Sequence, residues 1–353
     1  MTLAAPIDTA PPLHELPGVA QARRWLPALL RQQIATLAGP LEVACGYQLG
    51  LLDADGSPRP KPGGKLFRPA LALLCAAAVG GQQRDALVPA AAIELMHNAT
   101  LVHDDVMDGD RERRHRLTVW AQFGVPTAVL VGDALLALGF GMLSVDENPA
   151  APAAVADLAE TLRVLALGQE QDLTFEGHGE VSLAACLTMM ERKTGALLGC
   201  ACNLGARYGG ADPEWAARFA GFGSQLGLAL QIMDDVLGIW GDPAVTGKPV
   251  GADLRRRKKS APVVYALGGG TPAAAELAEI YRRPAPAQPG PAGDDEITEL
   301  RRLLTEAGAR TWAVRETERR LAAAWAYLDG LDLDPAGTAA LRVLADRLMA
   351  RTW

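Results

Sequence analysis

The sequence of 353 residues has few stretches in which β-branched and polar residues alternate, which is the pattern of a half-buried β-strand. Ala- and Leu-rich segments with helical spacing recur along the whole chain instead, and Pro or Gly residues mark most junctions between them. The sequence therefore predicts an all-α protein. The predicted helices cover residues 20–37, 41–51, 68–79, 87–107, 119–123, 126–143, 153–173, 183–208, 213–239, 261–267, 272–281, 296–308, 310–328 and 335–350.

An excess of positive charge is also lacking, since 34 Lys and Arg residues stand against 41 Asp and Glu residues, for a net charge of −7. Overall charge therefore does not favour binding to nucleic acid or to an anionic membrane. The five cysteines show no spacing typical of a zinc site, and their scatter through apolar segments indicates reduced core thiols in a cytoplasmic protein. The N-terminus lacks the basic region that begins a signal peptide.

The domain organisation is expected to be simple. Residues 1–17, rich in Pro and Ala, are predicted to be a flexible tail, and residues 18–353 are predicted to form one domain. Residues 283–294 are dense in Pro, Ala and Gly, which predicts a mobile surface loop within that domain. Residues 127–145 are nearly apolar enough for a membrane span, but Asp133 and several glycines interrupt them. We therefore expect a buried helix of a soluble protein there.

Two acidic clusters, each directly after an apolar run, carry most of the chemical information. The first is Asp104-Asp105-Val106-Met107-Asp108, in which Asp104 and Asp108 share one helical face. The second is Asp234-Asp235-Val236-Leu237-Gly238, which has no acid at its last position. Aspartate pairs beside an apolar core are costly unless cations or hydrogen bonds compensate them. Two such pairs facing each other would suit Mg²⁺ and, through Mg²⁺, a diphosphate.

Basic residues accompany both clusters. A run of arginines follows the first cluster, and Lys248, between Gly247 and Pro249, follows the second. Upstream, glycines at 63 and 64 stand beside Lys65 and Arg68 at a predicted helix start, where exposed amides and two cations suit a diphosphate. His97 lies two helical turns before Asp104 on the same face. The presence of these basic residues and of His97 near the acidic clusters favours a metal–phosphate site over a solvated acidic surface.

Taken together, these segments resemble the all-trans isoprenyl diphosphate synthase (polyprenyl synthetase) family. Eight stretches match in the family order from about residue 60 to 265. They are Gly63-Gly64-Lys65-x-x-Arg68-Pro69, Glu94-x-x-His97 with Val102-His103-Asp104-Asp105-x-x-Asp108, Arg113-Arg114, Gly168-Gln169-x-x-Asp172, Lys193-Thr194, Gln231-x-x-Asp234-Asp235, Gly247-Lys248, and Asp253-Leu254-x-x-x-Lys258-x-Ser260-x-Pro262.

The resemblance implies one large bundle of antiparallel helices around a deep central cavity, in a homodimer. It implies three Mg²⁺ ions, bound with the allylic diphosphate by Asp104, Asp105, Asp108, Asp234 and Asp235. It also implies that the allylic diphosphate is contacted by Arg113, Lys193, Lys248 and Lys258, and isopentenyl diphosphate by Gly64, Lys65, Arg68, His97 and Arg114. Thr194 and Gln231 are expected to present oxygen dipoles to the allylic cation, so that Lys193, Thr194, Gln231 and Lys248 form the catalytic set.

The implied reaction condenses isopentenyl diphosphate with an allylic diphosphate by ionisation, condensation and elimination, to give an all-trans prenyl diphosphate. Ala99 and Thr100 are small at positions where short-chain enzymes tend to carry aromatic residues, and Met96 is the next bulky residue one turn deeper. This favours a product longer than C15, with the C20 geranylgeranyl diphosphate as first choice and C25 or longer as alternatives.

The sequence departs from the family pattern at three positions. Gly238 replaces the third aspartate of the second motif, and Asp242, one turn further on, is a candidate to replace that acid. His115 replaces a glycine and Leu117 a proline after the first motif, and we expect a small effect on that loop.

Three alternatives remain. A class I terpene cyclase on the same scaffold would not need Lys65, Arg68, His97 and Arg114, and a non-catalytic partner subunit of a heteromeric synthase should have lost acids of the first motif. A helical binding protein with surface aspartates would not need the ordered basic partners.

Overall fold

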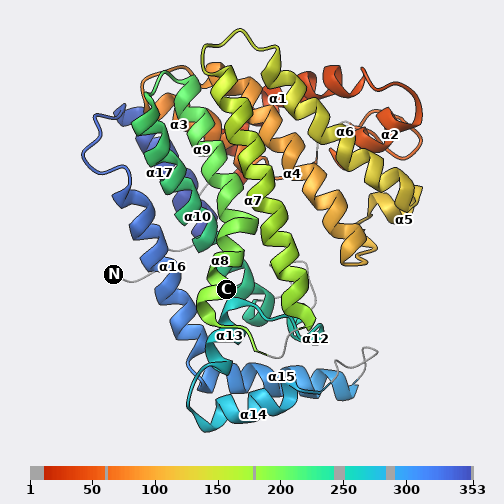
Figure 1. The fold of residues 1–353 in the computed structure, drawn as a ribbon, viewed down its shortest axis with the longest axis vertical. Coiled ribbons are helices and arrows are strands. Elements are labelled where there is room, and N and C mark those ends of the chain that lie inside the picture. Colours follow the sequence, from red (N-terminus) through yellow and green to blue (C-terminus); the bar gives the residue numbers. More distant parts are fainter. Residues whose placement is uncertain (1–11, 60–62, 178–179, 242–250, 284–290, 351–353) are drawn as a thin grey trace. The chain divides into compact units, whose positions relative to one another are not determined.

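The computed structural model describes residues 12–59, 63–177, 180–241, 251–283 and 291–350, and the prediction of an all-α protein is confirmed (Figure 1). The helices are α1 (Val19–Ile34), α2 (Gly39–Gln48), α3 (Phe67–Ala78), α4 (Leu87–Met107), α5 (Val119–Phe123), α6 (Val125–Ser144), α7 (Ala151–Gly177), α8 (Leu183–Met190), α9 (Ala196–Tyr208), α10 (Pro213–Trp240), α12 (Ala252–Arg255), α13 (Ala261–Leu267), α14 (Pro272–Tyr281), α15 (Pro291–Glu306), α16 (Ala309–Ala326) and α17 (Pro335–Met349). Short 3₁₀ turns cover Leu13–Glu15 and Gln83–Ala86. Within the described residues, strand structure is limited to a hairpin of β1 (Glu112–Arg113) and β2 (Arg116–Leu117) and an isolated bridge between Leu52 and Pro58.

The chain divides into two compact units. The first comprises residues 1–159, 200–217 and 331–344, and the second comprises residues 160–199, 218–330 and 345–353. The first acidic motif lies in the first unit and the second acidic motif in the second unit. The expectation of one domain over residues 18–353 stays a prediction.

The first unit is built around α4, which packs against α3 and along α6. Helix α3 is apolar on almost every side and is buried nearly throughout. Helix α9 approaches it closely at Gly205, where a β-carbon would lie 2.2 Å from the carbonyl oxygen of Ala72. Glycine at 205 therefore sets how closely these two backbones can pack.

Helix α6 contains nearly all of residues 127–145, the segment that resembles a membrane span in the sequence. Among the described residues, it alone is long and apolar enough to cross a membrane, and 39% of an apolar 18-residue stretch within it is buried. The expectation of a buried helix holds for the residues packed on α4, such as Val131 and Leu135, whereas Val129 and Leu130 on the same helix are exposed.

The second unit has its own apolar core. Helices α13, α14 and α15 pack together around Leu254, Leu277 and Leu300, each fully buried. Tyr265 of α13 stacks on Trp312 of α16 with ring centroids 4.7 Å apart. Helix α12 packs on α15, and its Leu254 is part of this core.

The predicted helix bounds agree with the structure at 87–107, 119–123, 261–267 and 272–281. The predicted helix 183–208 is interrupted by a π-helical turn, Glu191–Gly195, and the hairpin was not predicted. Of the predicted tail, residues 1–11 lie outside the described residues, and Leu16 is 1% exposed. Of the predicted loop, residues 284–290 lie outside them, and α15 already begins at Pro291. All five cysteines are free and buried, as expected.

We expect Gly205→Ala to lower the free energy of unfolding by about 1–3 kcal/mol, because its methyl group would collide with the α3 backbone. The matched control is Gly141→Ala in α6, where nothing lies within 4 Å of the added carbon. Because alanine favours a helix over glycine, the control should be neutral or more stable by up to about 1 kcal/mol. Urea unfolding measures both, and equal effects would show that the α3–α9 approach tolerates the side chain.

Candidate active site

The first acidic motif lies at the C-terminal end of α4, and its three aspartates differ in environment. Asp108 is exposed, Asp104 is half-buried and Asp105 is 1% exposed. Oδ1 of Asp105 accepts a hydrogen bond from Nε of Arg113 at 2.6 Å, whereas its buried Oδ2 has no hydrogen-bond partner. Burial raises the pKa of Asp105 to about 6, against the opposing effect of Arg113. A buried carboxylate oxygen is thus held ready for a further cation.

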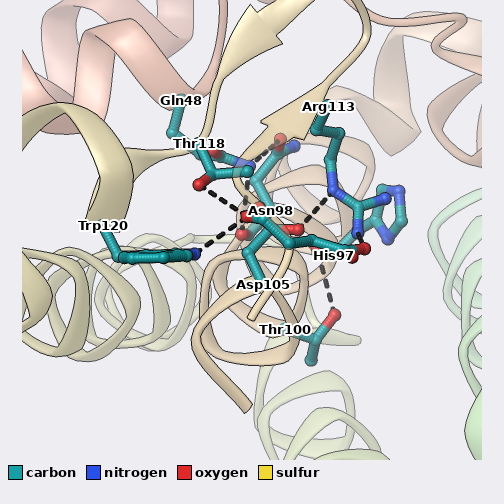
Figure 2. A network of polar contacts seen from close by, with 9 residues as sticks. Gln48, His97, Asn98, Thr100, Asp105, Arg113, Thr118 and Trp120 are labelled. Atoms are coloured by element: carbon teal, nitrogen blue, oxygen red, sulfur yellow. Dashed lines mark hydrogen bonds and ion pairs between the residues drawn. The ribbon is translucent and has the colours of Figure 1, made fainter. Parts of the chain in front are cut away.

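The hairpin after α4 delivers Arg113 to Asp105, as Figure 2 shows. Thr118 Oγ1 and Trp120 Nε1 both donate to the carbonyl oxygen of Asp110, each at 2.8 Å. These bonds join the segment after the hairpin to the residue before it. The turn residues Arg114 and His115 have φ values of 54° and 60°, as a type I′ turn requires. His115, where the family has glycine, therefore occupies a left-handed position at a cost of about 1–2 kcal/mol.

A cluster of basic side chains gathers around His97, which lies on α4 two helical turns before Asp104. Arg68 donates from Nη1 to Nε2 of His97 at 3.1 Å, which requires Nε2 to be unprotonated. Loss of hydration and the charges of Arg68, Arg114 and Arg113 hold the pKa of His97 well below its usual value. His97 is therefore a neutral acceptor that orients Arg68.

Glu94 is the carboxylate of this cluster and is 6% exposed. Burial raises its pKa, while the charges of Arg68 and Arg114 act in the opposite direction. Asn98 Nδ2 donates to Oε1 of Glu94 at 2.9 Å, and Gln48 Nε2 donates to Oδ1 of Asn98 at 3.3 Å. Figure 2 shows Gln48 and Asn98 meeting at the same network.

Gly64 completes this part of the site. Its φ of +85° suits glycine, and a β-carbon there would lie 3.5 Å from Nη1 of Arg114 and 3.8 Å from Oε1 of Glu94. Arg23 donates from Nη2 to the Gly64 carbonyl oxygen at 3.2 Å. The structure therefore brings Gly64, Arg68, His97 and Arg114 around Glu94, with the exposed Lys65 next in sequence. Arg23 was not predicted, because nothing in its local sequence marks it.

The second acidic motif lies on α10 and repeats the pattern of the first. Asp234 is exposed and Asp235 is 4% exposed. Gln231 Nε2 donates to Oδ1 of Asp235 at 3.1 Å, and the backbone N–H of Ala261 donates to Oδ2 at 3.2 Å. Burial raises the pKa of Asp235 to about 7, with Lys258 lowering it and Asp253 raising it further. In each motif, the second aspartate is thus the buried one.

The π-helical turn Glu191–Gly195 places two predicted residues beside this motif. Thr194 Oγ1 donates to Oε1 of Gln231 at 2.9 Å, which fixes the direction of the Gln231 amide towards Asp235. Lys193 Nζ forms an ion pair with Oδ2 of Asp172 at 2.6 Å. A β-carbon at Gly168 would lie 2.7 Å from the backbone nitrogen of Lys193. Glycine at 168 therefore leaves room for the π-helical turn. Single wide turns of this kind are frequent at functional sites.

The carboxylates fit Mg²⁺ together with a phosphate group. No three His, Cys, Asp or Glu side chains in the described part of the chain are already gathered into a metal site. Mg²⁺, however, is commonly bound by one or two carboxylates together with phosphate oxygens and water. The orphaned Oδ2 of Asp105 and the accessible Asp104, Asp108 and Asp234 offer such hard oxygens. The predicted Lys248 and the candidate Asp242 lie outside the described residues.

The all-α fold and paired aspartates with neighbouring cations define a prenyl-transferring enzyme of isoprenoid biosynthesis. The polyprenyl synthetase profile matches residues 59–290, and the chain belongs to this family. It is 43% identical over 309 residues to a geranylgeranyl diphosphate synthase of Mycobacterium tuberculosis, with 87% of each chain covered. It is 39% identical over 306 residues to a (2E,6E)-farnesyl diphosphate synthase of Mycobacterium bovis, with 87% of this chain and 85% of the relative covered. The crystal structure of a polyprenyl synthetase from Streptomyces coelicolor A3(2) matches with a TM-score of 0.88 and 41% identity, covering 94% of this chain and 98% of that one.

The raised pKa of Asp235 makes a prediction about stability. A carboxyl whose folded-state pKa lies above its unfolded value stabilises the fold fully only below the unfolded pKa, and this contribution is lost as pH rises through the folded pKa of about 7. Asp235 should therefore make the metal-free protein less stable between pH 5 and 7, by at most about 1.4 kcal/mol per pH unit. Asp235→Asn should remove this component, as urea unfolding in EDTA would measure.

The exposed neighbour provides the control, because Asp234→Asn removes the same charge without changing a buried group. Its pH dependence should match that of the unmutated protein. His97, whose pKa is lowered, contributes a slope of the opposite sign in all three proteins, so the comparison isolates Asp235. Parallel profiles for both variants would contradict the assignment.

Proposed function

We propose that this prenyl diphosphate synthase is a Mg²⁺-dependent enzyme that condenses isopentenyl diphosphate with an allylic diphosphate and releases an all-trans prenyl diphosphate of C20 or longer. The observation that carries this proposal is the repeated aspartate pair, in which one carboxylate is buried with a raised pKa and its neighbour is accessible. Such pairs have a strong physical reason to bind a cation. The basic cluster around Glu94 gives the second substrate a site of its own.

The proposed division of labour follows the chemistry of the two groups of residues. Bound Mg²⁺ would neutralise charge on the departing allylic diphosphate and so favour ionisation of the C–O bond. Asp104, Asp105, Asp108, Asp234 and Asp235 would hold the ions, and Arg113, Lys193, Lys248 and Lys258 would contact the diphosphate. Arg113 and Lys193 are paired with Asp105 and Asp172, which keeps both cations in fixed positions before substrate binds.

The second substrate would be held without metal. Gly64, Lys65, Arg68, His97 and Arg114 would bind the diphosphate of isopentenyl diphosphate through the backbone and through charged or polar side chains. The isopentenyl double bond then attacks the allylic carbocation, and we propose that the released diphosphate takes the proton that restores the alkene. Thr194 and Gln231, joined by their hydrogen bond, would direct oxygen dipoles towards the cation.

The structure distinguishes the residues proposed to set product length. Ala99 is fully buried and Met96 is 1% exposed, whereas Thr100 is half-buried and its Oγ1 donates to the His97 carbonyl oxygen at 2.9 Å. Thr100 is thus the partly accessible residue of the three. Because the two relatives described above are named for C20 and C15 products, we base the choice of C20 on the small side chains at 99 and 100.

A homodimer in the cytoplasm is part of the same proposal. The exposed apolar residues Val125, Val129 and Leu130 on α6 suit burial against a second copy of the chain, and five buried free thiols suit a reducing compartment. A terpene cyclase or a non-catalytic subunit is less favoured, because the residues for isopentenyl diphosphate and all three acids of the first motif are present.

Incubation with Mg²⁺, labelled isopentenyl diphosphate and each allylic primer should yield elongated diphosphates on chromatography. Asp104→Ala and Asp235→Ala should each lower turnover at least about a hundredfold, because each loses metal-dependent stabilisation of the leaving group. Asp332→Ala, which removes an exposed acid, is the control. A hydrocarbon made from one preformed allylic diphosphate would favour the cyclase, and near-normal turnover in both aspartate variants would refute the metal assignment.

We expect Thr100→Phe to shorten the product, because a ring at this half-buried position would fill space that the growing chain needs. Thr100→Ser keeps the hydroxyl group that bonds to His97 and should leave the product length unchanged. Chromatography of the dephosphorylated products measures both variants. An unchanged length in Thr100→Phe, with turnover retained, would show that the chain grows along another path.

A further inference from the structure

The second acidic motif has glycine at position 238, one helical turn after Asp234 on α10. Residues four apart in a helix share a face, so a side chain at 238 would stand beside Asp234. That space is already occupied. A β-carbon on Gly238 would lie 2.8 Å from Oδ2 and 3.5 Å from Cγ of Asp253. The Asp253 carboxylate therefore lies where the missing side chain would begin, and the two exclude each other in this arrangement.

The segment that carries Asp253 is docked firmly on α15. Leu254 is fully buried in the cluster that includes Ile297 and Leu300. Gly251, with φ of +69°, packs so closely that a β-carbon would lie 2.4 Å from Cγ2 of Ile297. The anchoring extends to both sides of Asp253, which fixes the backbone of that residue.

Two ion pairs strengthen this docking. Arg255 pairs with Asp294, and Arg257 pairs with Glu296 at 2.6 Å. The backbone N–H of Lys258 also donates to the carbonyl oxygen of Asp253 at 2.9 Å, which closes the turn after α12. Arg255 and Arg257 thus hold this segment against α15.

The charges around Asp253 suit a shared cation. Asp253 lies near enough to Asp235 to raise the pKa of that carboxyl, and Lys258 lies near enough to lower it. Carboxylates gathered in this way repel each other unless a positive charge lies among them. Lys258 supplies one such charge, and a divalent ion on Asp234 would supply more.

We propose that Asp253 supplies the carboxylate that the second motif lacks, and that glycine is present at 238 because it gives the Asp253 side chain its room. This inference rests on the proposed function, since the ligand is Mg²⁺ bound together with an allylic diphosphate. The third acid then comes from α12 in place of α10. Asp242 need not fill the gap.

The test measures metal binding directly. Isothermal titration follows Mg²⁺ binding in the presence of farnesyl thiolodiphosphate, an allylic analogue whose C–S bond resists ionisation. Asp253→Ala should weaken the apparent Mg²⁺ affinity at least about tenfold, the size of effect common for groups that support a metal site. The double variant Gly238→Asp with Asp253→Ala returns an acid to α10 and should recover most of that loss.

Two further variants separate the charge from its position. Gly238→Ala removes no acid but forces the Asp253 carboxylate away, so it too should weaken Mg²⁺ binding. Glu318→Gln removes an exposed acid of α16 in the same unit, and should bind Mg²⁺ like the unmutated protein. Thermal melting in the absence of ligand reports whether each variant is folded.

Unchanged Mg²⁺ affinity in Asp253→Ala would overturn the inference. Weakened binding that the double variant does not recover would overturn it as well, since Asp253 would then act only at its own position. If Asp253→Ala does not fold, Gly238→Ala decides the question, and unchanged affinity there overturns the inference. If the unmutated protein neither binds the analogue with Mg²⁺ nor elongates a primer, the proposed function has failed instead.

Discussion

The cost of burying one carboxylate in each aspartate pair is the constraint on which the rest of the site depends. Asp105 and Asp235 are 1% and 4% exposed, and burial raises their pKa values to about 6 and about 7. Arg113 bonds to one oxygen of Asp105, and the neutral Gln231 amide and Ala261 N–H bond to the two oxygens of Asp235, which offsets only part of that cost. The surrounding elements are arranged to supply these partial partners, and under the proposed function the metal–diphosphate complex supplies the remainder.

Close backbone packing is how the second unit meets this constraint. Gly227 of α10 and Gly195 of the π-helical turn meet so closely that a β-carbon on Gly227 would lie 2.9 Å from the Gly195 α-carbon. This approach puts Thr194 within hydrogen-bond reach of Gln231, which in turn donates to Asp235. The π-helical turn thus converts a close approach of two helices into a defined orientation for one amide group. Side chains larger than hydrogen at these glycines would lose that orientation.

The sequence was sufficient for the helices and for the identity of the chemical groups, because apolar spacing and the motif order are both local. Helix α4 illustrates this, since the apolar run before the acids predicts a helix that ends at the edge of the core. The sequence could not reveal contacts between segments that lie far apart in the chain. In the sequence, Gly238 looks like the loss of an acid. Only the position of Asp253, fifteen residues later, shows that a carboxylate lies in the space beside Gly238. The hairpin was missed because its turn holds Arg114 and His115 in place of glycine or asparagine, which normally mark such turns.

Under the proposed function, two diphosphates must be kept apart, and the buried carboxylates suggest how. Glu94 also has a raised pKa, but it lies near Arg68 and Arg114 and so offsets positive charge that is already present. Asp105 bonds to one cation, Arg113, but has Asp104 beside it, and the direct partners of Asp235 are the neutral Gln231 amide and Ala261 N–H. Under the proposed function, a bound metal would complete the balance of charge before a diphosphate binds there. A diphosphate without metal would therefore be repelled by the aspartate pairs and attracted by the basic cluster. On this proposal, the sign of the fixed charge would sort the two substrates before their hydrocarbon parts are recognised.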